Sequence, residues 1–276
     1  MRPAVDMEDD AALVRYLGLL GVARRPPGLE ALTELTSAHL TRIPFENVSK
    51  LYYGRRNAPP RRPPDLVRYL DGIERHHLGG TCYANAFNLH LLLAHLGYDV
   101  SLCGADMSAP DVHLVNVVWV EGRPYLVDVG YGAPFLEPLP LDVAEDQEIA
   151  WGRERYVLTP RDAAGRSRLE LHRDGELRHG YTVNPAPRRI EEFAQVIADS
   201  FSDEATFMHA LLIARFWPTR SVTLRNRTLI EAEGTRYRLR QIPGRADLPA
   251  AIEEHFLIPR GMAREALDGV DLTMQA

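Results

Sequence analysis

The chain has 276 residues, of which 45% are hydrophobic, and a formal net charge of −6. These values are typical of a compact soluble protein and exclude a disordered chain or a basic nucleic-acid-binding protein. No apolar stretch reaches the ~18 residues of a membrane span, and the acidic N-terminus is unlike a signal peptide. We therefore expect a cytoplasmic protein with no nucleic-acid partner and no membrane partner.

The first third of the chain has the periodicity of helices. Apolar residues recur at helical spacing over residues 8–20, 29–40, 64–73 and 82–96, with a proline-rich connection before the third segment. Gly97 marks the end of the fourth helix. Residues 1–96 are therefore expected to form a helical bundle.

The remaining two thirds have mainly the alternating pattern of strands. Between residues 97 and 185, turn signals at 121–122, 164–165 and 174–175 separate apolar alternations, which predicts an antiparallel β-barrel. The last region combines two predicted helices with three strands and is expected to form an α/β lid. Its predicted elements are a helix over 190–201, strands near 221–224, 228–232 and 237–241, and a helix over 248–256. The predicted fold class is α+β, with three domains at residues 1–96, 97–185 and 186–276.

Cys82 stands at the start of a predicted helix. Gly79 and Gly80 permit a tight turn before it, and Thr81 can cap the first helical turn. The positive end of the helix dipole favours a thiolate there, and the unpaired N–H groups can stabilise an oxyanion. Cys82 therefore suits acyl chemistry on sulfur, and the alternative is a small buried residue without chemistry. Cys103 is the other cysteine. Two cysteines are too few for a disulfide framework, although a single disulfide between Cys82 and Cys103 is possible.

His113 and Asp128 lie on the two strands of a predicted hairpin. A four-residue loop over 121–124 would pair Val120 with Tyr125. This register puts His113 and Asp128 on one face of the sheet, but about 13 Å apart along it. Contact between them requires a bulge, strong coiling or a loop that folds back. The alternative is a buried histidine that pairs with a nearby carbonyl.

Four segments together resemble the arylamine N-acetyltransferase family. They are Ile-Pro-Phe-Glu-Asn at 43–47, Gly-Gly-Thr-Cys-Tyr at 79–83, His113 with the apolar strand after it, and Tyr-Leu-Val-Asp-Val-Gly-Tyr-Gly at 125–132. The resemblance covers most of the chain and implies a helical bundle, a β-barrel and an α/β lid with a cysteine protease-like core. It also implies that the active site lies where the bundle meets the barrel.

The resemblance implies a ping-pong mechanism for this chain. Cys82 would take an acetyl group from acetyl-coenzyme A, a cosubstrate, and pass it to an arylamine, arylhydrazine or N-hydroxyarylamine. His113 is the expected base, and Asp128 is expected to orient its imidazole. The expected partner is thus a small aromatic amine or hydrazine, and the protein a monomer or homodimer.

The family also suggests which residues contact the two substrates. Phe45 and Tyr131 are the candidates for contact with the aryl group, although Phe45 is nearly as well explained by core packing. Val112, Gly130 and Gly132 are the candidates for contact with coenzyme A, because small residues let the backbone approach an acyl or phosphate group.

Three positions that are usually charged in the family are apolar here. Leu78 and Leu19 replace arginines, and Ala84 replaces an acidic residue. Packing can replace a buried ionic cluster at little net cost. Glu46 is retained without those neighbours, so we expect it either to face solvent or to pair with another cation. The candidate cations are Arg15, Arg42 and Lys50.

Two alternative functions stay open. A cysteine amide synthase or transacylase with a larger acyl donor would use the same assigned residues. A catalytically silent relative would bind an acyl-coenzyme A or a partner protein, but it would have no chemical need for Cys82, His113 and Asp128 together. Neither His-Glu-x-x-His nor paired Cys-x-x-Cys occurs, so we predict no metal.

Overall fold

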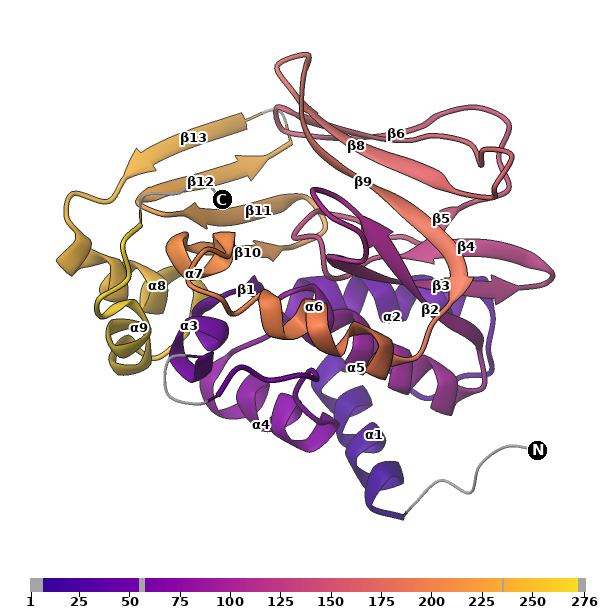
Figure 1. Ribbon diagram of the computed structural model, residues 1–276, viewed down its shortest axis with the longest axis horizontal. Coiled ribbons are helices and arrows are strands. Elements are labelled where there is room, and N and C mark those ends of the chain that lie inside the picture. Colours follow the sequence, from indigo (N-terminus) through magenta and orange to yellow (C-terminus); the bar gives the residue numbers. More distant parts are fainter. Residues whose placement is uncertain (1–6, 55–57, 235, 273–276) are drawn as a thin grey trace.

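The computed structural model describes residues 7–54, 58–234 and 236–272. Figure 1 shows the N-terminal helices on one side of the molecule, with two sheets above them. The helices are α1 (Met7–Leu20), α2 (Leu29–Arg42), α3 (Val48–Gly54), α4 (Leu66–His76), α5 (Cys82–Leu96), α6 (Ala194–Asp199), α7 (Thr206–His209), α8 (Leu248–Phe256) and α9 (Arg260–Leu267), with short 3-10 turns at Ile190–Phe193 and Arg245–Asp247.

The strands form two antiparallel sheets in the described chain. The larger sheet has the order β5-β4-β3-β2-β9-β8-β7-β6, and the smaller has the order β1-β10-β11-β12-β13. The strands of the larger sheet are β2 (Asp99–Asp106), β3 (His113–Val120), β4 (Arg123–Val127), β5 (Leu139–Pro140), β6 (Gln147–Trp151), β7 (Glu154–Leu158), β8 (Ser167–Arg173) and β9 (Glu176–Pro187). Those of the smaller sheet are β1 (Phe45–Glu46), β10 (Leu212–Phe216), β11 (Arg220–Arg225), β12 (Thr228–Glu233) and β13 (Arg236–Gln241). The α+β class is thus confirmed.

The four predicted N-terminal helices are present as α1, α2, α4 and α5. The third begins at Leu66 and not at Pro64, because the Asp65 carboxylate accepts a hydrogen bond from Arg68 N and caps the helix. Gly97 ends α5 in the left-handed region with φ 92°, as predicted. Thr81 is the N-cap residue of α5, but its side chain makes no capping hydrogen bond, so that expectation was wrong.

The hairpin of β3 and β4 differs from the predicted one in its loop. Val120 pairs with Arg123, and the turn consists of Glu121 and Gly122 alone, both with positive φ. A two-residue turn with positive φ at both positions matches the twist of antiparallel strands. The predicted four-residue loop and the pairing of Val120 with Tyr125 were therefore wrong.

The C-terminal region contains the predicted strands and more besides. β11, β12, β13 and α8 coincide with predicted elements, and the predicted helix over 190–201 is a 3-10 turn followed by α6. Strand β10 and helices α7 and α9 of this region were not predicted, nor was α3 in the N-terminal region. No helix of the described ranges is both long and apolar enough to cross a lipid bilayer.

The two sheets bury separate apolar clusters. One cluster joins α1, α2, α4 and α5 to the larger sheet, and the other joins α3 and the strands β10 to β12 to α8 and α9. The segment at 43–47 connects the two parts, because Phe45 pairs with Ala214 of β10 while Glu46 N donates to Gly80 O at 3.0 Å. A residue of the smaller sheet thereby contacts the turn that precedes Cys82.

Candidate active site

Cys82 is the first residue of α5 and is 8% exposed. The turn before it needs both of its glycines. Gly80 has φ 109°, a region that favours glycine, and a Cβ on Gly79 would lie 1.9 Å from Pro44 O. Gly80 O is also fixed by a hydrogen bond of 2.9 Å from the Asn85 side chain. The local sequence thus places a cysteine at a helix N-terminus on a rigid turn.

His113 and Asp128 make the contact that the predicted hairpin left open. His113 Nε2 lies 2.9 Å from Asp128 Oδ2, and both side chains are buried. The tighter turn shortens the offset along the sheet, because Asn116 pairs with Val127 and the next step puts Asp128 beside Val115. The predicted common face was right, since the shift of two residues keeps the alternation.

Asp128 has every oxygen occupied. Its Oδ1 accepts from Gly130 N at 2.9 Å, and its Oδ2 accepts from the hydroxyl of Tyr181 at 2.6 Å as well as from His113. Tyr181 is a fully buried residue of β9. Sequence reasoning missed it, and the only available signal was a tyrosine hydroxyl inside a strand whose burial demands a partner.

His113 interacts with the Cys82 thiol as well as with Asp128. Because Nε2 faces Asp128, the other ring nitrogen, Nδ1, is the one available to sulfur. Burial lowers the pKa of His113, but the charge and hydrogen bond of Asp128, with smaller effects of Cys82, outweigh it and raise the pKa to about 10. The imidazole is therefore protonated at neutral pH and can give a proton to a group bound beside Cys82.

The segment after Asp128 packs directly on the nucleophile. A Cβ on Gly130 would lie 2.6 Å from Cys82 Cα, so only glycine fits there. The N–H of Gly130 is already bonded to Asp128. On the other side of the thiol, Val112 O is 3.9 Å from Cys82 Sγ. Two of the three candidate coenzyme contacts, Val112 and Gly130, thus touch Cys82.

The two candidate substrate residues are also near the site. The Tyr131 ring centroid is 5.7 Å from that of His113, and its hydroxyl lies 2.8 Å from His179 Nδ1. Phe45 is buried, and a Cβ on Gly132 would lie 3.2 Å from its ring. The structure therefore brings Phe45, Tyr131 and Gly132 to the surroundings of the triad.

Glu46 has neither of the environments predicted for it. It is 0% exposed, and its carboxylate accepts from Ser49 N at 2.8 Å and from Gly79 N at 3.2 Å. Burial raises the pKa of Glu46, and hydrogen bonds from the Ser49 hydroxyl and from the backbone N–H groups oppose that shift. None of the ion pairs within the described ranges includes it. Both the solvent-facing and the ion-paired interpretation were wrong, because backbone donors replace the cations.

Two of the three predicted partners of Glu46 are bonded to other residues. Arg15 pairs with Asp71 at 2.7 Å and with Glu74 at 2.5 Å. Lys50 donates to Ser200 Oγ at 2.7 Å. Leu78 packs in the apolar cluster of the smaller sheet, as expected for an apolar replacement.

The second cysteine is separate from the site. Both Cys82 and Cys103 are free and buried, so no bridge joins them. Burial raises the pKa of Cys103 to about 12, which makes its thiol unreactive at neutral pH. Across the described ranges no cluster of three or more histidine, cysteine or acidic side chains could hold a metal ion.

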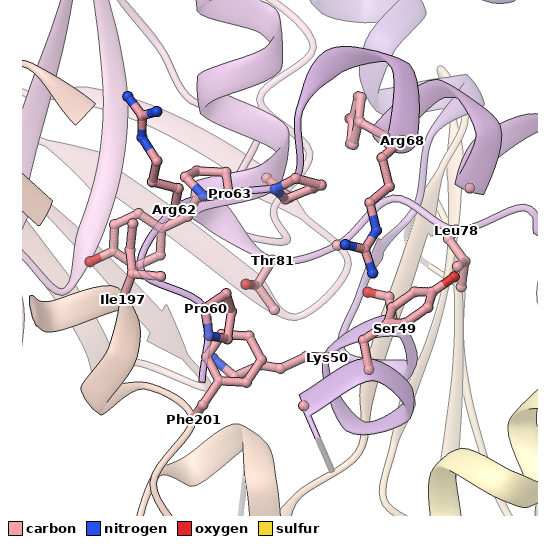
Figure 2. A pocket seen from close by; sticks show the side chains of 18 of the residues that line it. Ser49, Lys50, Pro60, Arg62, Pro63, Arg68, Leu78, Thr81, Ile197 and Phe201 are labelled. Atoms are coloured by element: carbon pink, nitrogen blue, oxygen red, sulfur yellow. The ribbon is translucent and has the colours of Figure 1, made fainter. Parts of the chain in front are cut away.

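A pocket of about 420 Å³ lies on the other flank of the turn before Cys82. Figure 2 shows Thr81 and Leu78 at this pocket, with Lys50 and Phe201 from neighbouring elements. The catalytic candidates Cys82, His113 and Asp128 are not among its described lining residues.

Comparison with known proteins identifies the family of the chain. Residues 28–262 match the family model described as N-acetyltransferase. The arylamine N-acetyltransferase pineal gland isozyme NAT-3 of Gallus gallus is 32% identical over 163 residues. That alignment covers 55% of this chain and 53% of the relative, so the chain spans about half of the relative's length. Proansamycin X synthase of Amycolatopsis mediterranei is 28% identical over 230 residues, which are 78% of this chain and 84% of that protein.

Solved structures share the fold. The arylamine N-acetyltransferase of Nocardia farcinica has a TM-score of 0.78 at 27% identity, and the match covers 99% of each chain. The family model extends over most of the chain, and the structural match over nearly all of it. The protein therefore belongs to the N-acetyltransferase family that includes the arylamine N-acetyltransferases.

Proposed function

We propose that the protein transfers an acetyl group from acetyl-coenzyme A to an arylamine, arylhydrazine or N-hydroxyarylamine through an acyl-Cys82 intermediate. The observation that carries this proposal is the arrangement of Cys82 at a helix N-terminus, next to a His113 that is hydrogen-bonded to Asp128 at 2.9 Å. Nucleophile, base and orienting carboxylate are the three groups that acyl transfer through sulfur requires.

The first half-reaction would load the enzyme. The Cys82 thiolate attacks the carbonyl carbon of the acetyl thioester, and the first N–H groups of α5, which have no partner within the helix, stabilise the oxyanion. Collapse of the intermediate breaks the bond to the sulfur of coenzyme A. The proton on His113 passes to that leaving thiolate, which releases coenzyme A as a thiol and leaves a neutral imidazole.

The second half-reaction would unload it. The amine nitrogen attacks the carbonyl carbon of acetyl-Cys82, and the neutral His113 takes the proton that the nitrogen loses. The bond from carbon to sulfur then breaks, which restores the thiolate and the imidazolium. Asp128 keeps the ring in position because Tyr181 and Gly130 hold the carboxylate on its remaining sites.

Substrate contacts follow from the surroundings of the triad. Phe45 and Tyr131 would hold the flat aryl group, and Val112, Gly130 and Gly132 would border the acetyl end of coenzyme A. The region 186–276 would act as the lid over a site formed between the helical region 1–96 and the sheet region 97–185. The 3-10 turn and α6 of this lid lie close to Cys82, because Phe193 and Ile197 share an apolar cluster with Cys82.

The half-reaction can be tested by intact-protein mass spectrometry. After brief incubation with acetyl-coenzyme A and no acceptor, we expect one added acetyl group on the wild type and none on Cys82→Ser. Cys103→Ser is the matched control and should be labelled like the wild type. Addition of an aromatic amine should then remove the label and yield the acetylated amine. Labelling that persists in Cys82→Ser would overturn the proposal.

One observation supports a second candidate function. The similarity to proansamycin X synthase extends over 84% of that protein, whose name describes a synthase and not an acetyltransferase. For this reason we keep an amide synthase or transacylase with a larger acyl donor as the second candidate. The two functions share Cys82, His113 and Asp128 and differ in the donor. An adduct that forms with a long-chain acyl thioester but not with acetyl-coenzyme A would favour this candidate over the first.

A further inference from the structure

The pocket beside the nucleophile turn has the size and the lining of a ligand site. Its volume of about 420 Å³ lies within the range of small-molecule sites, ~300–1,000 Å³. Four aromatic residues and three prolines are among its lining residues, together with a few polar groups. The wall residues on which the argument rests are Tyr53 of α3, Pro63 before α4, Tyr69 of α4 and Phe201 after α6.

Lys50 is the central feature of this pocket and the single lysine of the sequence. It is 8% exposed, and its ammonium lies 4.2 Å from the ring centroid of Phe201. Its one hydrogen bond among the described contacts goes to Ser200 Oγ, which is neutral. An ammonium has three N–H donors, so with one bonded to Ser200 and one side against the Phe201 ring, a donor remains for a ligand.

No carboxylate of the described residues compensates the charge of Lys50. Burial lowers the pKa of Lys50 to about 8, with only a weak opposing effect of Cys82. The acidic residue in the lining, Asp65, uses its carboxylate to cap α4. A buried charge without a partner costs free energy, which a bound anion would recover.

Two of the three positions that lack an expected charge lie at this pocket. Leu78 and Ala84, which stand where the family resemblance led us to expect charged residues, both line it. A second cation enters from α4, since Arg68 extends into the pocket in Figure 2 and lies over the Tyr53 ring at 4.9 Å. Of the two replaced positions, Ala84 stands where an acidic residue was expected, so that counter-charge to Lys50 and Arg68 is missing here.

We propose that this pocket binds a small organic anion with a flat apolar body, whose carboxylate is bound by Lys50. The rings of Tyr53 and Phe201 and the neighbouring proline would pack on the body of the ligand, and Arg68 would add a second positive charge. The site is distinct from the triad and does not depend on acyl transfer, since none of the triad residues is part of its described lining.

Calorimetric titration at pH 7 with benzoate and with its neutral analogue benzamide tests the proposal. Wild-type protein should bind benzoate at least about tenfold more tightly than benzamide, which is the effect of one charged hydrogen bond. Lys50→Met should remove this preference, and Lys50→Arg should keep it because the charge is retained. Arg75→Met removes an exposed cation from α4 outside the pocket lining and is the matched control.

The outcomes separate this site from the catalytic one. Cys82→Ser should bind benzoate like the wild type, whatever its turnover. Equal affinity of the wild type for benzoate and benzamide would overturn the proposal, as would a Lys50→Met variant that binds benzoate unchanged. Circular dichroism of each variant establishes that a lost preference reflects the charge and not the fold.

Discussion

The turn before Cys82 has a buried basic residue on each side, His113 on one flank and Lys50 on the other, and the two differ in their partners. On one flank, His113 has an acid partner, and Asp128 raises its pKa to about 10 in spite of burial. On the other flank, the described residues give Lys50 only a serine and a ring, and burial lowers its pKa to about 8. We call the His113 side the saturated flank, because the hydrogen-bonding atoms of its network all have partners, which fixes the imidazole for catalysis. The Lys50 ammonium lacks a charged partner among the described residues and is therefore suited to bind an anionic ligand.

The two flanks also differ in how the backbone supports them. His113 lies on β3, Tyr181 on β9 beyond the intervening β2, and Asp128 directly after β4, so hydrogen-bonded ladders fix their spacing. The Lys50 flank is assembled from the short helix α3, the proline-rich connection before α4 and the end of α6. Rigid strands suit a constellation that must hold its geometry, and short connected elements suit a pocket with variable occupancy.

The largest expected effect is that of Asp128→Asn. The amide nitrogen would face the N–H of either Gly130 or His113, so one hydrogen bond of the network is lost and the imidazole loses its charge partner. We expect the rate of acetyl transfer to fall by roughly 10³–10⁴-fold. Steady-state kinetics with an aromatic amine measure this change.

Asp142→Asn is the matched control for this variant. Asp142 pairs with Arg123 at 2.8 Å on the surface of the same hairpin. Its loss should leave the rate within about twofold of the wild type, because exposed ion pairs contribute little. A wild-type rate in Asp128→Asn would make the His113 flank structural and remove the contrast between the flanks.

A smaller effect is expected from Gly130→Ala. The added Cβ would lie 2.6 Å from Cys82 Cα and 3.0 Å from Cys82 Cβ, so the nucleophile must move away from His113. A displacement of this kind should lower the rate of Cys82 acetylation by about 10²-fold. Gly261→Ala on α9 meets no atom within 4 Å and is the control. A wild-type rate of acetylation in Gly130→Ala would show that Cys82 can shift relative to His113 without loss of reactivity.

Sequence patterns predicted the catalytic candidates better than their supports. Cys82 was recognisable because a helix start after two glycines is a local signal. Contact between His113 and Asp128 was not predictable from the hairpin, because Pro124 was read as a loop residue. It lies instead within β4 opposite Trp119, and this shortens the turn. Tyr181 could not be assigned from a local pattern, since its role depends on the packing of β9 beside β2.

The same limit explains the elements and environments that were missed. Helix α3 has 7 residues and α9 has 8, which is too short for a reliable helical period. Glu46 was expected in solvent or in an ion pair because carboxylates are rarely buried alone. Its actual donors are backbone N–H groups, whose direction depends on the turn at Gly79 and on the start of α3.

The stability of Lys50→Met tests whether Lys50, unlike His113, is a buried charge without a charged partner. Because the pKa of Lys50 is lowered from 10.5 to about 8 in the folded protein, the unfolded chain holds this proton more tightly. Lys50 therefore destabilises the fold fully below pH 8, and this effect disappears as the pH rises to 10.5. Lys50→Met should raise the free energy of unfolding by about 1–3 kcal/mol at pH 7.

Urea unfolding at pH 7 and at pH 10 measures this gain and its loss. The exposed cation of Arg75 provides the comparison, since Arg75→Met should change the unfolding free energy by less than about 0.5 kcal/mol. A decrease in stability for Lys50→Met at pH 7 would mean that the charge of Lys50 is already stabilised by partners in the protein. The two flanks would then both have a paired basic residue, and the contrast between them would be lost.

The smallest effect is expected from Tyr181→Phe, which removes a single donor from the saturated flank. The ring remains against His113, with centroids 4.8 Å apart, while Asp128 Oδ2 loses the hydroxyl at 2.6 Å and keeps its bond to His113. One charged hydrogen bond should lower the turnover number roughly tenfold, with the KM for acetyl-coenzyme A nearly unchanged, because the hydroxyl orients Asp128 and touches neither substrate. Tyr98→Phe loses a hydroxyl that bonds Gly28 O at 3.1 Å, away from the triad, and should keep the wild-type turnover. If Tyr181→Phe also keeps the wild-type turnover, Gly130 and the β-sheet are enough to hold Asp128, and the Tyr181 hydrogen bond is not needed for catalysis.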